Sequence, residues 1–541
     1  MTDPTSQPLN SYDAVPYPST PYRGTHPDTL ATLGTLVGMK PAPIDSCRVL
    51  ELGCSDGGNL LPMAYGLPGS EFVGIDGSAR QIELGLGMLE ALGLKNVTLK
   101  QMNLLDLGNQ FGKFDYIIAH GIYSWVQPDV QDKILEACQC LLKPQGLAFV
   151  SYNTYPGWHM RGMIREMMLY HIRRQNEAET KVAGARALLS FLTEKVGTPE
   201  TANLTATDTS AYSAVLRYEQ SLLAQYTDSY LYHEHLEDIN RPVYFSEFIE
   251  RAARHELQYV SEADFVSAQI VNFAPAVAET IRSMAADLIE TQQYMDFVSN
   301  RTFRQTVLCR ADVPLNRTLD PDRLSPFYIA SPIKPAADSV EIASFKEETF
   351  ATHIGKALTT GVPVVKAALF HLGAIWPLSI GFEALVAAAH ERLEPGAPHV
   401  FSAQKLAQDS QVLGQTLLQC FAQGMAEFRV HPALYTTEIA SRPTASAVAR
   451  LQARTGATVG NMRHEQLTLD DVSRHLLVYL DGEHDRAELF NALAKLVDEG
   501  VVVVQSADGK PAAAETERNT LLAEALNQAL QKIAGSALLI T

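Results

Sequence analysis

A loop with three glycines between two apolar runs constrains the fold of this chain more than any other feature of its sequence. Gly53 directly follows the apolar run 48–52, and Gly57-Gly58 precede the next amphipathic stretch. The second apolar run, residues 71–76, ends in an aspartate. A strand, a glycine-containing turn, a helix and a second strand that ends in an acid are typical of parallel sheets that bind a ligand at the carboxyl ends of their strands. We therefore expect a binding site at that edge of a sheet.

The alternation of apolar runs and amphipathic stretches continues to about residue 152. It predicts strands at 48–53, 71–76, 97–101, 114–119 and 146–152, and helices at 58–66, 78–92 and 129–142. Strands and helices that alternate at this spacing indicate a parallel sheet with helices on both faces. Two later strands, 257–261 and 305–310, are expected to complete the sheet, with 176–240 and 264–300 inserted as a helical cap. The predicted fold class is α/β with a Rossmann-like sheet.

A chain of 541 residues exceeds what one hydrophobic core usually organises. We expect a ligand-binding core with an N-terminal arm (1–175), a helical cap or regulatory region that completes the sheet (176–319), a winged-helix-like module (320–430), and a second such module with a docking helix (431–541). In both modules short helices are expected to end in a β-rich segment. Acidic residues crowd the second module, so a protein-packing or regulatory role is favoured over DNA binding.

Acidic residues exceed basic ones by 18, and this balance repels phosphate backbones and anionic membrane faces. We therefore expect no nucleic-acid partner and no membrane insertion. The six cysteines show no metal-binding spacing, which predicts reduced, buried thiols and no metal site. The N-terminus lacks the basic end and apolar core of a signal peptide, so the chain is placed in the cytoplasm. The oligomeric state is left open, with a homodimer among the states considered.

The glycine loop and the acid after it narrow the class of ligand. Asp76 can accept both hydroxyls of a ribose, which predicts an adenosine-containing cofactor. A dinucleotide and S-adenosylmethionine both meet that description. A dinucleotide loop needs glycine where Ser55 stands, and Asp56 would repel a pyrophosphate at the helix N-terminus. The cationic sulfonium and amino groups of S-adenosylmethionine suit Glu51 and Asp56 instead, so this cofactor is favoured.

Several motifs occur in a fixed order over the first 150 residues: Glu51-Leu-Gly-Cys-Ser-Asp-Gly57, Asp76, Asn103, Phe114-Asp115 and Leu142-Lys-Pro-Gln-Gly146. As a set they resemble the motifs of class I S-adenosylmethionine-dependent methyltransferases. The sequence departs from that pattern at Ser55, where many members have glycine, and at Asn103, where an aspartate is common. The resemblance implies a Rossmann-like catalytic sheet and S-adenosyl-L-methionine as the cofactor.

Further motifs over nearly the whole chain are similar to those of a narrower bacterial family. They are Tyr17-Pro-Ser-Thr-Pro-Tyr22, Thr25-His-Pro-Asp28, His120-Gly-Ile-Tyr-Ser-Trp125, Tyr152-Asn-Thr-Tyr-Pro-Gly-Trp158 and Leu480-Asp-Gly-Glu-His-Asp-Arg486. Members of that family carry a methyltransferase regulatory domain, and they include outer-membrane-protein lysine methyltransferases. The resemblance implies a catalytic, a regulatory and a C-terminal domain, and a protein lysine as the substrate.

The expected cofactor-binding residues lie at or beside strand ends, with one tyrosine from the N-terminal arm. They are Tyr22, Glu51, Gly53, Cys54, Asp56, Asn59, Asp76, Gly77, Ser78, Asn103, Leu104, His120 and Gly121. Asp76 is expected to bind the ribose, the Asn103 amide the adenine amino group, and the Leu104 backbone the adenine ring. Three tyrosines of the arm, Tyr12, Tyr17 and Tyr22, are expected to fold over the methionine end.

Aromatic and polar residues that follow the fourth and fifth strands are the candidate catalytic residues: Tyr123, Trp125, Tyr152, Asn153 and His159. With Tyr155 and Trp158 they could line a channel that attracts a lysine ammonium by cation–π contact and favours its deprotonation by desolvation. His120 or His159 could act as a base, or merely bond the cofactor. A role of the two tryptophans as core anchors is equally compatible with the sequence.

Protein-lysine methylation is the leading function. The alternatives are methylation of a small molecule and a cofactor-binding scaffold or regulatory protein without activity, and the intact Glu51, Gly53 and Asp76 argue against the last. All cofactor motifs precede residue 147, and the sheet is expected to be complete by about residue 312. A fragment that ends near Leu319 is therefore expected to keep cofactor binding, with the C-terminal modules serving substrate choice or regulation.

Overall fold

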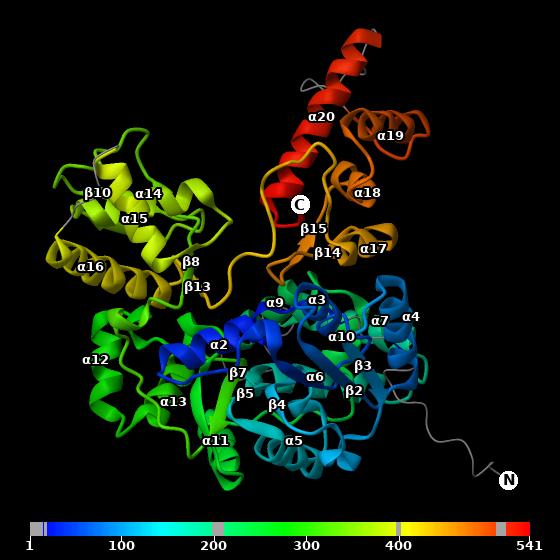
Figure 1. Ribbon diagram of the computed structural model, residues 1–541. Coiled ribbons are helices and arrows are strands. Elements are labelled where there is room, and N and C mark those ends of the chain that lie inside the picture. Colours follow the sequence, from blue (N-terminus) through cyan, green and yellow to red (C-terminus); the bar gives the residue numbers. More distant parts are fainter. Residues whose placement is uncertain (1–14, 16–18, 197–209, 396–401, 505–514, 541) are drawn as a thin grey trace.

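A seven-stranded sheet with the order β3-β2-β1-β4-β5-β7-β6 forms the centre of the catalytic part (Figure 1). The computed structural model describes residues 15, 19–196, 210–395, 402–504 and 515–540. The first five strands run parallel, and β7 is antiparallel to both of its neighbours. The strands are β1 (Arg48–Leu52), β2 (Glu71–Asp76), β3 (Val97–Gln101), β4 (Phe114–Ala119), β5 (Leu142–Asn153), β6 (Leu257–Glu262) and β7 (Phe303–Arg310). The predicted Rossmann-like α/β class and its completion by two late strands are confirmed.

Helices cover both faces of the sheet, which explains why its strands read as continuous apolar runs. Consecutive residues of β1 point to opposite faces and show this arrangement. Val49 packs in the core with α2 (Pro27–Leu36), α3 (Leu60–Gly66) and α4 (Ala79–Leu92). Leu50 packs on the other face, where α5 (Pro128–Leu141) and α11 (Phe245–Arg254) lie.

Two predicted boundaries shift for local reasons. β5 begins at Leu142, four residues before the predicted start, because Leu142 pairs with Phe114 across a register shift. α3 begins at Leu60, and the two residues before it belong to the glycine loop.

The cap consists of helices inserted between β5 and β7. The first group packs around a hydrophobic cluster of its own: α6 (Gly157–Ile172), α7 (Ala178–Lys195), α9 (Ser210–Leu223) and α10 (Asp228–His235). The second group, α12 (Pro275–Met284) and α13 (Leu288–Ser299), lies between β6 and β7. Among the described residues, no helix is both long and apolar enough to cross a bilayer.

The described residues of the middle module form two small sheets and three helices. The strands are β8 (Tyr328–Ala330), β9 (Lys334–Pro335), β10 (Glu348–Ala351), β11 (Ala357–Thr360), β12 (Ile380–Gly381) and β13 (Glu427–Arg429), and the helices are α14 (Pro363–Ile375), α15 (Phe382–Leu393) and α16 (Ala403–Ala422). The predicted order of helices followed by strands is wrong here, because β10 and β11 precede α14.

The C-terminal module places a β-hairpin between its first two helices. Its elements are α17 (Ala447–Thr455), β14 (Thr458–Gly460), β15 (Gln466–Thr468), α18 (Asp471–Tyr479), α19 (Arg486–Asp498) and α20 (Glu515–Gly535). The β-rich segment expected at 501–504 forms no strand; of its valines only Val502 is buried. The apolar stripe of α20 packs in one cluster with α18 and α19. Figure 1 shows this module and the middle module on the side of the catalytic part where α2 and α3 lie.

A buried arginine joins the late strands to the cap. Arg304 of β7 is completely buried; its Nη1 lies 2.7 Å from Glu262 Oε1 of β6, and its Nη2 lies 2.8 Å from Asp296 Oδ1 of α13. Its guanidinium also lies 3.7 Å from the ring centre of Phe245 of α11. A buried charge is tolerated only when its partners compensate for lost hydration, and here two carboxylates do so.

Replacement of this arginine should expose its role. Arg304→Leu leaves the Glu262 and Asp296 carboxylates buried without their cation, and we expect it to lower the free energy of unfolding by about 3–5 kcal/mol. Differential scanning calorimetry of the full chain measures the effect on the transition of the catalytic part. Arg310→Leu, on the same strand, is the matched control. Arg310 pairs with the exposed Asp312, and loss of such a surface pair should leave the transition almost unchanged. Equal shifts in the two variants would contradict this role.

Candidate cofactor and acceptor site

The glycine loop after β1 adopts a backbone conformation that requires glycine. Gly53 and Gly57 have φ values of +72° and +76°. A Cβ atom at Gly53 would lie 2.8 Å from Ile122 Cγ2, so a larger residue would displace the segment after β4. Gly77, after β2, has open space where a Cβ atom would lie. The open space at Gly77 therefore leaves the backbone accessible to a ligand at the carboxyl end of β2.

Asp76 holds the loop in place at the end of β2. Its Oδ2 accepts a hydrogen bond from the backbone N–H of Ser55 at 2.9 Å, and its Oδ1 accepts one from Ser78 N–H at 2.8 Å. Ser78 is buried and caps α4 by accepting from Gln81 N–H. The carboxylate expected at the ribose thus also fixes the turns before and after it.

The buried side chain of Asn59 connects three parts of the chain at this loop. Its Nδ2 donates to Glu51 Oε1 at 2.7 Å. Its Oδ1 accepts from Tyr22 N–H at 3.0 Å and from Thr25 Oγ1 at 3.1 Å, both in the N-terminal arm. His464, in the C-terminal module, approaches the same Oδ1 with Nε2 at 2.8 Å. Because an amide oxygen only accepts, His464 is the donor in this bond.

Glu51 lies beneath the loop with half of its carboxylate unsatisfied. Burial raises the pKa of Glu51 to about 8, against the hydrogen bond from Asn59, and the nearby Asp76 and Asp56 act in the same direction as burial. Among the described residues, Glu51 Oε2 has no hydrogen-bond partner. A cationic ligand group would supply the missing charge and the missing donor.

The N-terminal arm covers the loop. Asn59 N–H donates to Ser19 Oγ at 3.1 Å, and the ring of Tyr22 stacks on His120 with 4.7 Å between ring centres. Burial lowers the pKa of His120 to about 4, so its imidazole is neutral at pH 7 and is a weak base. His120 Nδ1 lies 3.1 Å from Ser151 Oγ, which accepts from Gly121 N–H. Tyr12 and Tyr17 lie outside the described residues.

The other expected cofactor residues occupy the same edge. Asn103 is exposed, and its Oδ1 accepts from Leu105 N–H at 3.0 Å, while Leu104 is half-buried. Asp56 Oδ1 accepts from Gly58 N–H at 3.0 Å, and Cys54 is buried. All six cysteines are free. Among the described residues, no group of three or more acidic, histidine or cysteine side chains is arranged to hold a metal ion.

The structure separates the candidate catalytic residues into three environments. Tyr123 and Tyr152 are buried in the core and pack with Phe248 of α11. Trp125 contacts the buried Trp158 edge to face, with 6.4 Å between ring centres. Burial of one tryptophan of this pair supports the alternative of a core anchor.

Asn153 and His159 lie at the rim after β5, one buried and the other exposed. Asn153, at the end of β5, is buried and donates from Nδ2 to Asn240 Oδ1 at 3.2 Å. His159 is exposed; it stacks on Tyr155, with 4.0 Å between ring centres, and its Nε2 lies 3.1 Å from Tyr244 Oη.

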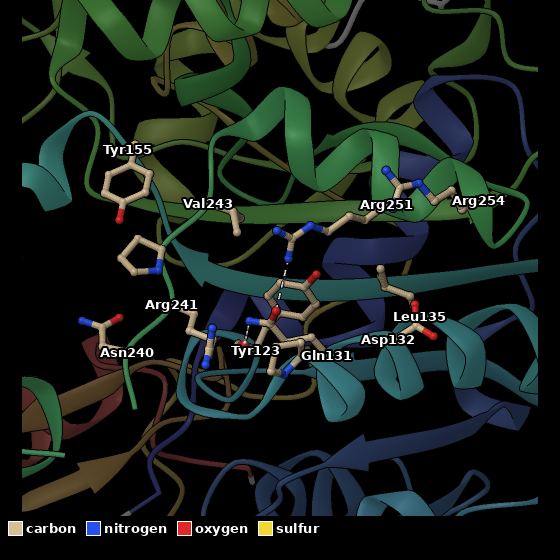
Figure 2. Close-up of a pocket in the computed structure, with 12 residues that line it drawn as sticks. Tyr123, Gln131, Asp132, Leu135, Tyr155, Asn240, Arg241, Val243, Arg251 and Arg254 are labelled. Atoms are coloured by element: carbon tan, nitrogen blue, oxygen red, sulfur yellow. Dashed lines mark hydrogen bonds between the residues drawn. The ribbon is translucent and has the colours of Figure 1, made fainter. Parts of the chain in front are cut away.

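The structure brings in functional candidates that the sequence did not indicate. A pocket of about 570 Å³ lies between α5, α11 and the segment that contains Asn240, and Tyr123 and Tyr155 line it (Figure 2). Three arginines that are unremarkable in the sequence, Arg241, Arg251 and Arg254, also line this pocket. No spacing or motif in the sequence marks them.

Ion pairs attach the arm to both C-terminal modules. Glu427 Oε1 of β13 lies 2.7 Å from Arg23 Nη1 of the arm and 2.7 Å from Arg463 Nη2 of the C-terminal module. These arginines hold the pKa of Glu427 below its usual range despite its burial. Asp28 Oδ1 of α2 accepts from Val430 N–H at 2.8 Å. The modules beyond residue 319 therefore contribute directly to the surroundings of the glycine loop.

This contact revises the expectation for a fragment that ends near Leu319, which would lose His464 and Glu427. We expect His464→Leu to weaken S-adenosylmethionine binding about 3- to 10-fold, the worth of roughly one hydrogen bond, and the fragment to lose more. Isothermal titration calorimetry measures both. His475→Leu, on α18 of the same module, is the control and should bind as the parent chain does. Parental affinity of the His464 variant would show that the contact does not support the site.

Three family models match separate parts of the chain. They are a methyltransferase domain over residues 44–196, a predicted methyltransferase regulatory domain over 227–310, and the C-terminal winged helix domain of PKMT over 441–538. Together they match the sheet, the segment that completes it, and the last module.

Two proteins resemble the chain over nearly its whole length. An uncharacterized protein of Rickettsia prowazekii is 33% identical over 538 residues, which cover 98% of this chain and 94% of that one. The structure of PKMT2 from Rickettsia typhi in complex with AdoHcy is 30% identical, with a TM-score of 0.85, and the match covers 97% of this chain and 100% of that one. The chain therefore belongs to the family of class I S-adenosylmethionine-dependent methyltransferases in which a regulatory domain and a PKMT winged-helix domain accompany the catalytic domain.

Proposed function

We propose that this S-adenosylmethionine-dependent methyltransferase transfers methyl groups to lysine amines of a protein. The full-length likeness to PKMT2, which includes the PKMT-type winged-helix domain, is the observation that carries the proposal. The pocket on the α5 and α11 side is consistent with it, because it opens beside the ends of β4 and β5.

The residues around the glycine loop fit the cofactor. Gly77 leaves open space beside it, and Glu51 offers an unsatisfied carboxylate oxygen to a cationic group. In our assignment, Glu51 with Asn59 faces the methionine amino group, Asp76 the ribose, and Asn103 with Leu104 the adenine. The remaining expected residues contribute backbone or arm contacts: Tyr22, Cys54, Asp56, Ser78, His120 and Gly121. When bound, the cofactor supplies a methyl carbon activated by its sulfonium.

The chain's task on the acceptor side is to align an uncharged amine and exclude water. Tyr155, His159 and Tyr244 form a partly exposed aromatic group that can attract a lysine ammonium. Asn153 is oriented by Asn240, and we assign it to the approach of the acceptor. Trp125 forms the wall beside it. The buried Tyr123 and Tyr152 support this wall from the core.

The class of acceptor is tested with cofactor that carries a labelled methyl group. The chain is incubated with fractionated bacterial lysate, and we expect label in acid-precipitable protein that acid hydrolysis releases as methyl-lysine. Asp76→Ala serves as the inactive control. Label found only in small soluble molecules would favour the small-molecule alternative, and no label in any fraction would favour a scaffold without activity.

The cofactor assignment makes Asp76 indispensable. Asp76→Ala removes hydrogen bonds to a charged carboxylate, and we expect it to weaken S-adenosylmethionine binding by about 1.5–3 kcal/mol. Asp45→Ala, in the exposed turn before β1, is the matched control. Calorimetry with NAD should show no binding to the parent chain, because Asp56 repels a pyrophosphate. A change below twofold in the Asp76 variant, with the fold intact, would exclude the assignment.

Glu51 should make cofactor binding depend on pH. Its raised pKa means that the folded chain without cofactor binds a proton that the unfolded chain has released between about pH 4.5 and 8. Folding stability from this group therefore falls as pH rises through that window. A cationic ligand favours ionised Glu51, so cofactor affinity should rise with pH up to about 8. Below that pH, cofactor binding should release the Glu51 proton. Calorimetry in buffers of different ionisation enthalpy measures the release, which should disappear in Glu51→Gln and persist in Glu71→Gln.

The use of a metabolic cofactor supports a cytoplasmic location as part of the same proposal. The homodimer considered from the sequence stays a prediction, which light scattering of the purified chain tests.

A further inference from the structure

The pocket of about 570 Å³ on the α5 and α11 face collects positive charge in a chain whose net charge is −18. Arg241 comes from the segment before α11, and Arg251 and Arg254 come from α11 itself. Figure 2 shows the Arg251 side chain extending from α11 toward Gln131 and Tyr123 across the pocket. The buried Tyr123 also lines the pocket beside Arg251.

The residues around this pocket neutralise its positive charge only in part, since one carboxylate faces three guanidinium groups. None of its three arginines forms an ion pair within the described part of the chain. Arg241 Nη2 donates to Gln127 Oε1 at 3.1 Å and Arg251 Nη1 to Gln131 Oε1 at 3.2 Å, and both acceptors are neutral amides. Asp132 is the one carboxylate among the lining residues, and its Oδ1 lies 2.7 Å from His255 Nε2. The pocket therefore offers guanidinium groups to an anion from outside.

Hydrogen bonds connect this pocket to the rim where the acceptor must arrive. Arg241 N–H donates to Ser124 O at 2.8 Å, and Val243 N–H donates to Asn153 O at 3.1 Å. Asn240, which lines the pocket, accepts from the Asn153 side chain. Tyr155 lines the pocket and stacks on His159. A substrate polypeptide that places one side chain at the end of β5 can therefore place its neighbouring residues in the pocket.

We propose that this pocket, named here the arginine pocket, binds carboxylate side chains of an acidic segment beside the methylated lysine of the protein substrate. The inference rests on the proposed function and adds the kind of sequence that the enzyme selects. Guanidinium groups match carboxylates in geometry and hold them by paired, charge-assisted hydrogen bonds. The volume is that of a site for a few side chains, and the acidic remainder of the protein repels a nucleic-acid backbone.

The arginine pocket also offsets the electrostatic repulsion between this acidic protein and an acidic substrate. A chain of net charge −18 repels acidic segments at long range, so a local group of unpaired cations is needed to hold such a segment. Part of this attraction is screened by salt, because Arg241 and Arg254 are exposed. Binding should therefore weaken as the ionic strength rises.

Synthetic peptides test this inference on the full chain. One peptide carries a central lysine flanked by glutamates, and its partner carries glutamines instead. Fluorescence anisotropy measures the binding of each, and methyl transfer from labelled cofactor gives KM and kcat. We expect the glutamate peptide to bind at least tenfold more tightly and to have the lower KM. We also expect poly-glutamate to compete for binding while a single-stranded oligonucleotide does not.

Matched variants locate the effect. Arg241→Gln with Arg251→Gln should raise the Kd and KM of the glutamate peptide at least tenfold, with kcat and cofactor affinity within twofold of the parent. Arg217→Gln with Arg282→Gln removes the same charge from exposed positions on α9 and α12. This double variant should leave the Kd and KM of the glutamate peptide unchanged. Equal affinity for both peptides, equal effects of the two double variants, or preference for the oligonucleotide would each overturn the inference.

The experiments distinguish failure of the proposed lysine methylation from failure of the arginine pocket as a substrate site. Methyl-lysine formed in lysate proteins with no preference for the glutamate peptide would leave lysine methylation standing and reject the arginine pocket as a substrate site. Tight, arginine-dependent binding of glutamate peptides without methyl transfer to any protein would support the site and reject lysine as the acceptor.

Discussion

The side-chain amide of Asn59 is the contact on which the arrangement of the catalytic edge depends. One amide group donates to the buried Glu51 and accepts from the arm and from His464. A buried carboxylate without this donor would face a larger desolvation cost. The glycine loop, the arm that covers it and the last module are therefore held in one hydrogen-bonded unit.

Buried ionic groups also join separate elements at two other places. Arg304 joins β6, β7 and α13 inside the catalytic part, and Glu427 joins Arg23 of the arm to Arg463 of the C-terminal module. Each group is surrounded by partners of opposite charge, which makes its burial tolerable and its geometry specific. The first group stabilises the sheet itself. The second positions the arm above the loop, so the C-terminal modules act on the site through structure as well as through any contact with a substrate.

The same principle distinguishes the arginine pocket from those groups. Arg304 and Arg463 lie opposite carboxylates of their own chain, whereas the Arg241 and Arg251 side chains donate to the neutral amides of Gln127 and Gln131. Arginines that form no ion pair with any described residue, next to the ends of β4 and β5, are suited to an external anion. Cofactor binding and substrate selection are thus both assigned to the carboxyl edge of one sheet. Glu51 acts on the α2 and α3 face, and the arginines act on the α5 and α11 face.

The sequence by itself determined the sheet, the glycine loop and the residues at its edge, because strand periodicity and turn chemistry are local properties of the chain. Gly53 must be glycine for its own φ, and Asp76 lies at a strand end whatever the rest of the chain does. The tertiary structure decided that His464 reaches Asn59 across 405 positions, that Tyr123 and Tyr152 are core residues, and that three arginines share a pocket. These contacts arise from how elements distant in the sequence pack together, and no period or motif in a single sequence encodes which distant side chains will meet.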